Sequence, residues 1–279
     1  MPPNALLRTF GAAGMSHKNV HKCHGVVVVT GGSRGIGAST CKVLARDGFA
    51  VVINYVHSKN AAEIVAKEII DDVPVECVQA DVSNENDVRK MFRRVEEFCS
   101  EQGLPFYGLV NNAGILGPRR GLIEEGETDG TSLEREFLKV LRTNCVGPLL
   151  CTREAAVLMK KSGNHGGCIV NISSGSSNIG KPLLYAASKG ALNSLQAGLI
   201  SELCSLGIRI NTISPGLTAT DMIAGLDTAS FGDSIPMGRV GSPAEIAEGV
   251  SFLMSPKASY VAGANIRISG GKAPGTFIG

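Results

Sequence analysis

A tyrosine and a lysine stand four residues apart in a stretch of small residues, YAASK, at 185–189. If the stretch is helical, this spacing places the side chains of Tyr185 and Lys189 on the same face. A phenol has an ordinary pKa near ~10, and a cation beside it favours the phenolate and lowers that pKa. Such a pair can protonate a developing alkoxide or take a proton from an alcohol. The alternative is a solvated polar pair that has no chemical role.

A glycine-rich segment, TGGSRGIG at 30–37, directly follows an apolar run and opens a helical pattern. We expect Gly31 to permit a tight turn, Gly35 to let the backbone approach a pyrophosphate, and Gly37 to allow close packing of helix against strand. The segment therefore predicts a dinucleotide-binding loop with a variant glycine spacing. A glycine-rich turn that binds no nucleotide is the alternative.

The residues after the second predicted strand favour NADP(H) over NAD(H). Proteins specific for NAD hold the ribose 2′-hydroxyl with an acid at the end of that strand. The segment INYVHSKN (53–60) has Asn54 in that region and no Asp or Glu, and basic residues flank Ser58. Arg34 lies inside the glycine-rich segment. The missing acid and the added bases suit a 2′-phosphate, unless Arg34 merely faces solvent.

Strand-like and helical patterns alternate from Gly25 onward and form the scaffold for these residues. Short β-branched apolar runs predict strands, and longer stretches with helical spacing predict helices. The predicted strands cover 26–30, 50–55, 75–80, 107–114, 167–174, 208–214 and 264–271, and the predicted helices cover 35–48, 60–70, 84–103, 131–161, 185–207 and 242–255, with Asn84, Ser132 and Ser242 as N-caps. This order predicts an α/β fold, a doubly wound Rossmann-type sandwich with a central seven-stranded parallel sheet in a single domain.

Two long segments, 115–130 and 216–238, are rich in glycine and polar residues and do not fit this alternation. Both follow predicted strands, at the edge of the sheet where ligands bind in folds of this class. Long loops in such places are usually functional. We expect both to border the site, and the second to act as a mobile lid.

Seven short motifs carry a family resemblance, and they occur in the family's order across residues 25–271. They are TGGSRGIG (30–37), ADV (80–82), NNAG (111–114), TN (143–144), VNISS (170–174), YAASK (185–189) and SPG (214–216). With them the chain resembles the short-chain dehydrogenases/reductases, in particular the 3-oxoacyl-acyl-carrier reductase-like and sugar dehydrogenase-like members. The resemblance implies an enzyme that transfers hydride between NADP(H) and a carbonyl or alcohol substrate, chiefly by reducing a ketone, and that requires no metal.

The resemblance also implies four catalytic residues. Tyr185 is the acid or base, Lys189 assists it and reaches the nicotinamide ribose, and Ser174 polarises the substrate carbonyl. Asn144 holds a water that passes protons from Lys189; a core asparagine bonded to the backbone is the alternative. Ser174 and Tyr185 are eleven residues apart, fewer than is usual in the family. The shortened loop leaves Ser176 as a rival for Ser174 and changes the border of the substrate pocket.

The same resemblance assigns contacts to the coenzyme. Asp81 bonds the adenine amine with Val82 against the ring, and Thr220 holds the nicotinamide carboxamide. The small residues after the fourth predicted strand let the coenzyme lie close. The complete expected coenzyme set is Gly31, Ser33, Arg34, Gly35, Ile36, Gly37, Asn54, Ser58, Asp81, Val82, Asn112, Ala113, Gly114, Tyr185, Lys189, Pro215, Gly216, Thr218 and Thr220.

Composition excludes several other function classes. The 279 residues carry a net charge of +2, so nothing favours nucleic acid, and no apolar run is long enough for a membrane span. The eight cysteines form no CxxC pair, which indicates reduced, space-filling thiols, no metal site and a cytoplasmic compartment. We expect a small-molecule substrate, and a homo-oligomer, a dimer or a tetramer, is implied by the family through helices 131–161 and 185–207. A non-catalytic NADP(H)-binding sensor or scaffold is the alternative function.

Residues 1–24 differ from the rest of the chain. They carry bases and no acid, and the first acid along the chain is Asp47. We expect a flexible basic extension that precedes an NADP-binding oxidoreductase domain at 25–279. The extension is either an organelle-targeting segment or a tail without that role.

Overall fold

The computed structural model describes residues 23–69, 73–119, 132–162, 166–224 and 234–272. Most of the predicted extension at 1–24 lies outside these residues, so its targeting role stays a prediction. The proposed lid is described only at 216–224 and 234–238. Its mobility also stays a prediction.

The chain alternates strands and helices along its length. The strands are β1 (Val26–Val29), β2 (Ala50–Tyr55), β3 (Val75–Gln79), β4 (Phe106–Asn111), β5 (Gly167–Ile172), β6 (Ile208–Pro215) and β7 (Asn265–Ile268). The α-helices are α1 (Gly35–Arg46), α2 (Lys59–Glu68), α3 (Glu85–Gln102), α4 (Leu133–Leu141), α5 (Gly147–Lys161), α6 (Ser176–Ile179), α7 (Leu183–Ser205) and α9 (Pro243–Met254). A π-helical turn η1 (Arg142–Val146) and two 3₁₀ turns, η2 (Asp221–Ile223) and η3 (Pro256–Ala258), complete the set.

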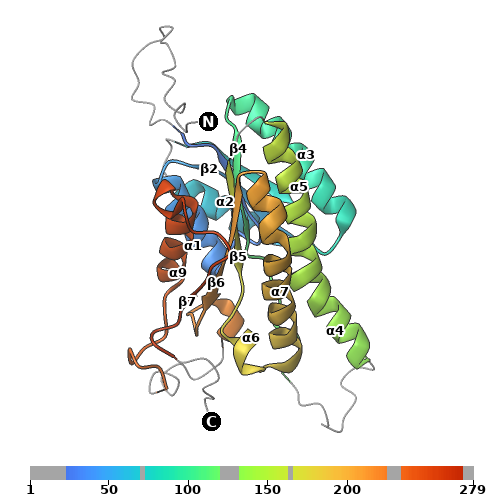
Figure 1. The fold of residues 1–279 in the computed structure, drawn as a ribbon, viewed down its shortest axis with the longest axis vertical. Helices are drawn as coiled ribbons and strands as arrows, with labels where there is room; N and C mark the ends of the chain where they lie inside the picture. The colour runs from blue at the N-terminus through green and yellow to red at the C-terminus, as the bar shows by residue number, and fades with distance from the viewer. Residues whose placement is uncertain (1–22, 70–72, 120–131, 163–165, 225–233, 273–279) are drawn as a thin grey trace, which may run out of the picture.

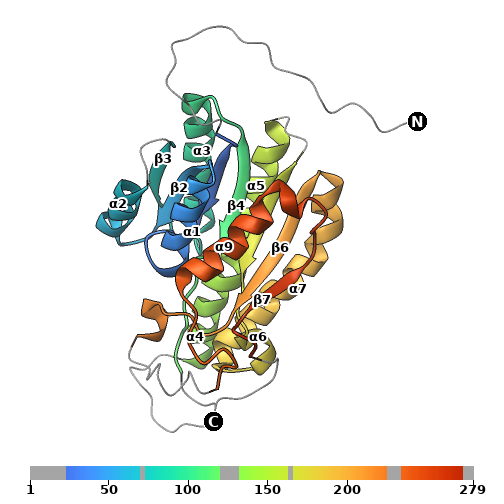
Figure 2. The ribbon, with the colours of Figure 1, turned by 90° about the vertical axis from the view of Figure 1, so that its left-hand side faces the viewer.

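The seven strands form one parallel sheet in the order β3-β2-β1-β4-β5-β6-β7. Helices α1, α2 and α9 cover one face, and α3, α5 and α7 cover the other (Figures 1 and 2). The predicted doubly wound α/β sandwich is therefore confirmed. Every residue of β1 is buried, because helices exclude water from both faces of the sheet. The strand order reverses at β1, which opens a crevice at the carboxyl ends of β1 and β4.

The predicted N-caps of the helices are confirmed. The Asn84 side chain accepts hydrogen bonds from two backbone amides of the first turn of α3. Ser132 accepts from Arg135 N at the start of α4. Ser242 and Glu245 form a reciprocal capping box at the start of α9. These bonds satisfy amides that have no partner within the helix.

The predicted single helix over 131–161 is wrong in its middle. The π-helical turn η1 separates α4 from α5, and Gly147 N donates to Arg142 O across it. Pro148 has no amide hydrogen for the carbonyl of Asn144, and its ring would collide with that carbonyl in an α-helix. Widening the turn removes the collision, so Pro148 accounts for the interruption and for the place of Asn144 within it.

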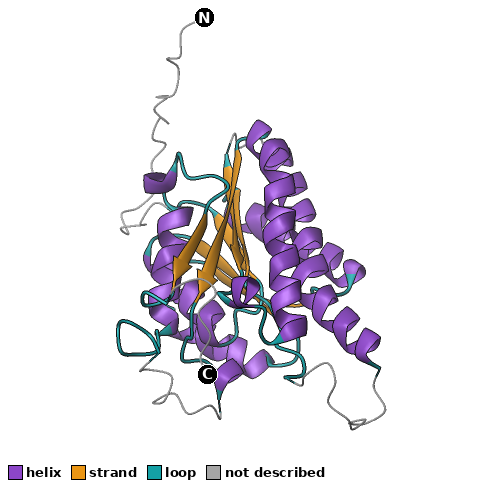
Figure 3. Cartoon of the chain, turned by 60° about the horizontal axis from the view of Figure 1, so that its bottom comes forward, coloured by secondary structure: helices purple, strands orange, loops and turns teal. Residues whose placement is uncertain are grey.

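The predicted last strand, 264–271, is also too long. Strand β7 ends at Ile268, and a tight turn follows in which Gly270 and Gly271 have φ of 62° and 85°. Positive φ is a conformation that glycine adopts without strain and that interrupts a strand. The turn borders the same cavity as the loops after the other strands, at the end of the sheet that Figure 3 brings forward.

The cysteines are all free, with Cys41, Cys151 and Cys168 buried in the core and Cys204 exposed. The expectation of buried thiols holds for the first three. No helix in the described part of the chain has both the length and the apolar character of a membrane span. Among the described residues, no three His, Cys, Asp or Glu side chains gather as metal ligands would.

Candidate active site

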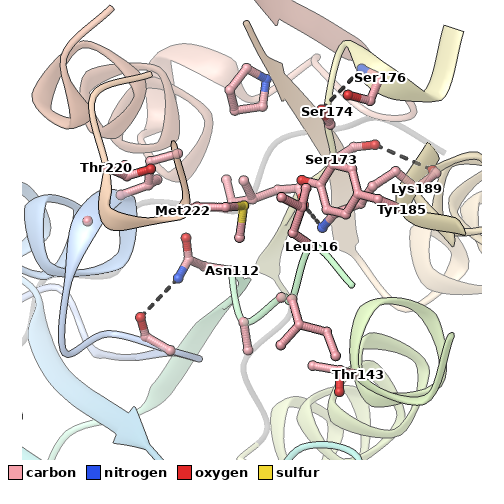
Figure 4. Close-up of a pocket in the computed structure, with 18 of the residues that line it drawn as sticks. Asn112, Leu116, Thr143, Ser173, Ser174, Ser176, Tyr185, Lys189, Thr220 and Met222 are labelled. Carbon is pink, nitrogen blue, oxygen red and sulfur yellow. Dashed lines mark hydrogen bonds between the residues drawn. The ribbon is translucent and has the colours of Figure 1, made fainter. Parts of the chain in front are cut away.

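A cavity of about 1520 Å³ lies at the carboxyl ends of the strands, between the two helix layers (Figure 4). Most of the expected site residues line it, although they come from segments far apart in the sequence. They are Gly31, Ser33, Arg34, Gly35, Ile36, Ser58, Asp81, Val82, Asn112, Ala113, Gly114, Ser174, Tyr185, Lys189, Pro215, Gly216, Thr218 and Thr220. Three expected site residues do not line it: Gly37, Asn54 and Asn144.

The glycine-rich segment forms a cradle that side chains would fill. Gly31 has φ of 62°, and a Cβ on it would lie 3.0 Å from Ala113 Cα. Gly35 has φ of 54°, and a Cβ on it would lie 3.3 Å from Thr220 Cγ2. The open space between this segment and the residues that face it therefore exists because glycine has no side chain. Such a gap at the start of a helix fits the pyrophosphate of a dinucleotide.

A threonine that the sequence did not single out holds this cradle in place. The Thr30 hydroxyl accepts hydrogen bonds from the amides of Asn112 and Ala113, both at 3.0 Å. The Asn112 side chain donates to Thr30 O and Gly31 O at 2.9 and 3.1 Å. The segments after β1 and β4 are thus locked together. In the sequence, this role of Thr30 is indicated only by its position at the end of β1, directly before Gly31.

Asn54 does not contact the cavity, contrary to its expected place in the coenzyme set. Its side chain is buried; Nδ2 donates to Ala80 O at 2.9 Å, and Oδ1 accepts from Gly31 N at 3.2 Å. Asn54 therefore joins the ends of β1, β2 and β3. An acid at this position could accept the Gly31 bond but could not donate to Ala80 O. The residue shapes the site without facing it.

Ser174, Tyr185 and Lys189 meet on one wall of the cavity, opposite the segment that carries Thr220 (Figure 4). Tyr185 is 8% exposed and Lys189 is 3% exposed. The ammonium of Lys189 lies 5.7 Å from the centre of the Tyr185 ring and donates to Ile172 O at 2.7 Å. The predicted pairing of these two residues on one helix face is present in α7.

The expected acidic phenol is not found in the protein alone. Burial raises the pKa of Tyr185, and its hydrogen bond with the Ser174 hydroxyl lowers that pKa by less. The Lys189 ammonium is engaged by the carbonyl of Ile172, and burial sets the direction of the Tyr185 pKa. Burial also lowers the pKa of Lys189 to about 8, although nearby Cys145 acts in the opposite direction. Of this pair, Lys189 is therefore the residue whose pKa moves toward neutral pH.

Asn144 corresponds to the alternative named for it, a buried side chain bonded to the backbone. Its Nδ2 donates to Ile115 O at 2.8 Å and to Ser188 Oγ at 3.0 Å, and its Oδ1 accepts from Ile115 N at 2.8 Å. Both amide hydrogens are used, so a water beside Lys189 would have to bond an oxygen of this residue, and the expected water stays a prediction. Asn144 fixes the loop after β4 against α7.

The choice between Ser174 and Ser176 follows from their contacts. The Ser174 hydroxyl accepts from Ser176 N at 3.1 Å and lies near enough to the Tyr185 phenol to lower its pKa. Ser176 thus helps to orient Ser174 through its backbone. Ser173 is buried and its hydroxyl points the other way, toward Lys189 O at 3.4 Å. Of these serines, Ser174 is the one whose hydroxyl lies beside the Tyr185 phenol at the cavity wall.

The buried Lys189 predicts a specific dependence of stability on pH. Its pKa is about 8 in the folded protein, against 10.5 for an ordinary lysine, so the unfolded chain binds this proton more tightly. Folding therefore carries a cost on the order of 3 kcal/mol below pH 8, which disappears as the pH rises to ~10.5. Relative to a Lys189→Met variant, the wild type should gain stability between these pH values.

Denaturant unfolding of both proteins at several pH values would measure this gain. The loss of the bond to Ile172 O changes the stability of Lys189→Met at every pH, so only the pH-dependent part is diagnostic. A difference in the free energy of unfolding that stays constant from pH 7 to ~10 would contradict the burial cost of the ammonium.

Known proteins resemble this chain in sequence and in fold. A family model described as enoyl-(acyl carrier protein) reductase matches residues 31–273. The uncharacterized oxidoreductase YgfF of Escherichia coli (strain K12) is 41% identical, over 88% of this chain and 99% of its own. A short chain dehydrogenase from Burkholderia cenocepacia in complex with NADP is 30% identical, with a TM-score of 0.76, over 90% of this chain and 98% of its own. The chain belongs to the short-chain dehydrogenase/reductase family.

The family membership that the motifs suggested is thus confirmed, and with it the class of oxidoreductases. A 3-oxoacyl-[acyl-carrier-protein] reductase of Synechocystis is 35% identical over 88% of this chain and 96% of its own. In this short-chain dehydrogenase/reductase the motifs predicted the cradle after β1 and the cavity wall that carries Ser174, Tyr185 and Lys189. The two long loops expected to border the site contribute Ile115, Leu116, Arg119, Met222 and Ile223 to the rest of the cavity. No pattern in the sequence indicated Ile179, Pro182, Arg267 and Lys272, which also line it.

Proposed function

We propose that this protein is an NADP(H)-dependent carbonyl reductase that acts on a small ketone, with the 3-oxoacyl thioesters and sugars named above among the candidates. The observation that supports this most directly is the convergence of Ser174, Tyr185 and Lys189 on the cavity that the glycine-rich cradle borders. A protein that only binds the nucleotide has no need of this wall. When bound, NADP(H) supplies or accepts the hydride.

The catalytic wall would handle the proton and the developing charge. The Ser174 hydroxyl hydrogen-bonds the carbonyl oxygen and stabilises negative charge on it. Tyr185 gives its phenolic proton to the same oxygen, which becomes the alcohol. Because burial raises the pKa of Tyr185, the phenol keeps its proton at neutral pH, and an acid in this place favours reduction. Lys189, beside it on α7, supplies positive charge to the Tyr185 phenolate formed in the step.

A direct test is an assay of NADPH and NADH oxidation with a panel of ketones and 3-oxoacyl thioesters. We expect turnover with at least one ketone and a higher kcat/KM with NADPH than with NADH. Binding of NADPH with no turnover on any carbonyl compound would contradict the proposal and favour the sensor or scaffold.

The preference for NADP(H) rests on Arg34. Its Nη1 lies 4.0 Å from Asp221 Oδ2, and both side chains are largely exposed, at 72% and 75%. An exposed pair of this kind is held weakly, so the guanidinium is free to turn toward a 2′-phosphate. Ser58, which also lines this end of the cavity, can donate to the same phosphate.

Arg34→Gln should raise the KM for NADPH about tenfold or more, because it removes a charge-assisted bond to the 2′-phosphate. The KM for NADH, which has no such phosphate, should change little. Arg46→Gln is the matched control, since Arg46 lies at the other end of α1 and pairs with Glu248. Steady-state kinetics with both coenzymes decides the point. Equal losses with NADPH and NADH would show that Arg34 does not read the phosphate.

We also propose that the protein forms a homodimer or homotetramer through α4, α5 and α7. Large apolar side chains are exposed on these helices and on η1, which is unusual for a surface that stays in water. They are Leu133, Leu138, Val146, Leu149, Val157, Leu183 and Leu206. Light scattering after gel filtration should give a multiple of the chain mass, and Leu149→Glu with Val157→Glu should lower it. A monomeric wild type would overturn the proposal.

A further inference from the structure

A second buried lysine lines the same cavity, beyond the glycine-rich cradle. Lys272 follows β7 and is only 9% exposed. Within the described residues its ammonium has no hydrogen bond and no carboxylate within 4.0 Å. Lys189, the other buried lysine, donates to a carbonyl. An ammonium that lies at a cavity wall and has no partner there can bond an anionic group that enters the cavity.

The turn that carries Lys272 is built to hold it in place. Lys272 N donates to Ser269 O at 3.2 Å, and the Arg267 guanidinium donates to Lys272 O. Between them, a Cβ on Gly270 would lie 2.7 Å from Ile235 Cγ2, so the turn packs tightly against its neighbour. The lysine therefore projects from a fixed backbone. Arg267 also lines the cavity and adds a second positive charge behind it.

Backbone contacts place this turn near the catalytic wall. Gly175 N donates to Pro215 O at 2.9 Å, and Gly216 N donates to Ile268 O at 2.8 Å. The segments after β5, β6 and β7 thus lie side by side, so the chain near Ser174 and the turn after β7 are separated by two strand spacings, about 10 Å. A lysine side chain spans part of that distance, so a substrate of a few carbon atoms can bond Ser174 and Lys272 at the same time.

The charges around this part of the cavity have mostly one sign. Arg119, Lys139 and Arg142 also line the cavity, and its acids among the described residues are Asp81, Glu134 and Asp221, of which Asp221 lies 4.0 Å from Arg34. A cleft lined by one sign of charge draws ligands of the other sign. Burial also lowers the pKa of Lys272, as expected for an ammonium that lacks a counter-charge.

We propose that Lys272, supported by Arg267, binds an anionic oxygen group of the substrate, a carboxylate in the first instance, so that the enzyme reduces oxo acids or other anionic ketones. One unpaired ammonium balances the single charge of a carboxylate. A phosphate ester would offer the same kind of oxygen, and the experiment below separates the two. This inference rests on the proposed reductase function, because it names the substrate class of that site.

The test compares ketones with the same 3-oxo group, one with a free carboxylate and one in which an ethyl ester removes the charge. Acetoacetate and ethyl acetoacetate carry the same ketone, and only the first is an anion at neutral pH. We expect the wild type to prefer acetoacetate, and Lys272→Met to lose about tenfold or more of kcat/KM on it. The ester should lose much less, because it has no charge for Lys272 to bind. Lys257→Met, an exposed lysine outside the cavity, is the control and should change neither.

Dihydroxyacetone phosphate and dihydroxyacetone form the phosphate arm. A loss confined to the phosphate ester would assign a phosphate in place of a carboxylate. Equal losses on charged and neutral ketones, or no loss on either anion, would overturn the inference while leaving the reductase function intact. Lys272→Gln is the second variant, in case Lys272→Met does not fold.

If neither ketone is reduced by the wild type, the binding of acetoacetate to the NADP⁺-loaded protein still decides the matter. Isothermal titration of wild type and Lys272→Met should then show weaker binding by the variant. Equal binding by the two proteins would overturn the anion site. The failure of the reductase function is a separate outcome, because it appears in the kinetic assay alone.

Discussion

Tyr185→Phe should reduce turnover by a factor of about 10²–10⁴ while NADPH binding stays close to that of the wild type. The substitution keeps the buried ring and removes only the phenolic hydroxyl, the proposed proton donor. Ser174 keeps its bond from Ser176 N, so the oxygen site remains formed. Initial rates with the best ketone of the panel and titration of NADPH fluorescence measure the two quantities.

Tyr107→Phe is the matched control for this experiment. The Tyr107 hydroxyl donates to Met254 O at 2.7 Å, and the residue does not line the cavity. We expect a modest loss of stability, about 1 kcal/mol, and unchanged kcat. If Tyr185→Phe kept more than about a tenth of the wild-type kcat, the phenol would not be the acid. If both variants lost activity equally, the effect would be structural.

Gly37→Ala should abolish high-affinity NADPH binding. A Cβ on Gly37 would lie 2.3 Å from Gly31 O and 2.5 Å from Asn112 Nδ2, closer than non-bonded atoms approach. Gly31 O belongs to the backbone, and the Asn112 side chain is held by its own hydrogen bonds, so neither atom can move away at low energetic cost. The cradle must shift, at a cost of roughly 1–3 kcal/mol in stability. Because pyrophosphate binding needs that cradle, we expect the Kd for NADPH to rise at least about tenfold.

Gly198→Ala separates this effect from a general intolerance of alanine. Gly198 is exposed in α7, and a Cβ on it would meet nothing within 4 Å. Alanine there should stabilise the helix by up to ~1 kcal/mol and leave NADPH binding unchanged. Thermal unfolding and NADPH titration of the two variants give the comparison. Normal affinity in Gly37→Ala would mean that the cradle is not the pyrophosphate site.

Short motifs predicted the coenzyme half of the site because local chemistry dictates it. Glycines at fixed offsets and a Tyr-Lys pair one helical turn apart carry their geometry in their spacing. The substrate half depends on residues that only the fold brings together. Arg267 and Lys272 come from the turn after the last strand, and Arg119 from the loop after β4. No spacing in the sequence connects them.

Two features of the candidate catalytic residues have physical causes that composition does not reveal. The pKa of Tyr185 depends on the balance between burial, which raises it, and the neighbouring Ser174 hydroxyl, which lowers it. The role of Asn144 depends on the widened helical turn before Pro148, which sets its side chain against Ile115. Both outcomes follow from three-dimensional packing, whereas the strands and N-caps follow from local pattern.

The lock between Thr30 and Asn112 has a consequence for biosynthesis. The hydrogen bond from Asn112 N joins residues 82 positions apart, and β1 pairs with β4 in the same region. A ribosome releases the chain from its N-terminus, and pairing between distant segments waits until both have emerged. The cradle therefore cannot mature until translation has passed Asn112. Until then β1, an uninterrupted run of valines, lacks one neighbour in the sheet, and nascent chains in this interval should be the ones that most need a chaperone.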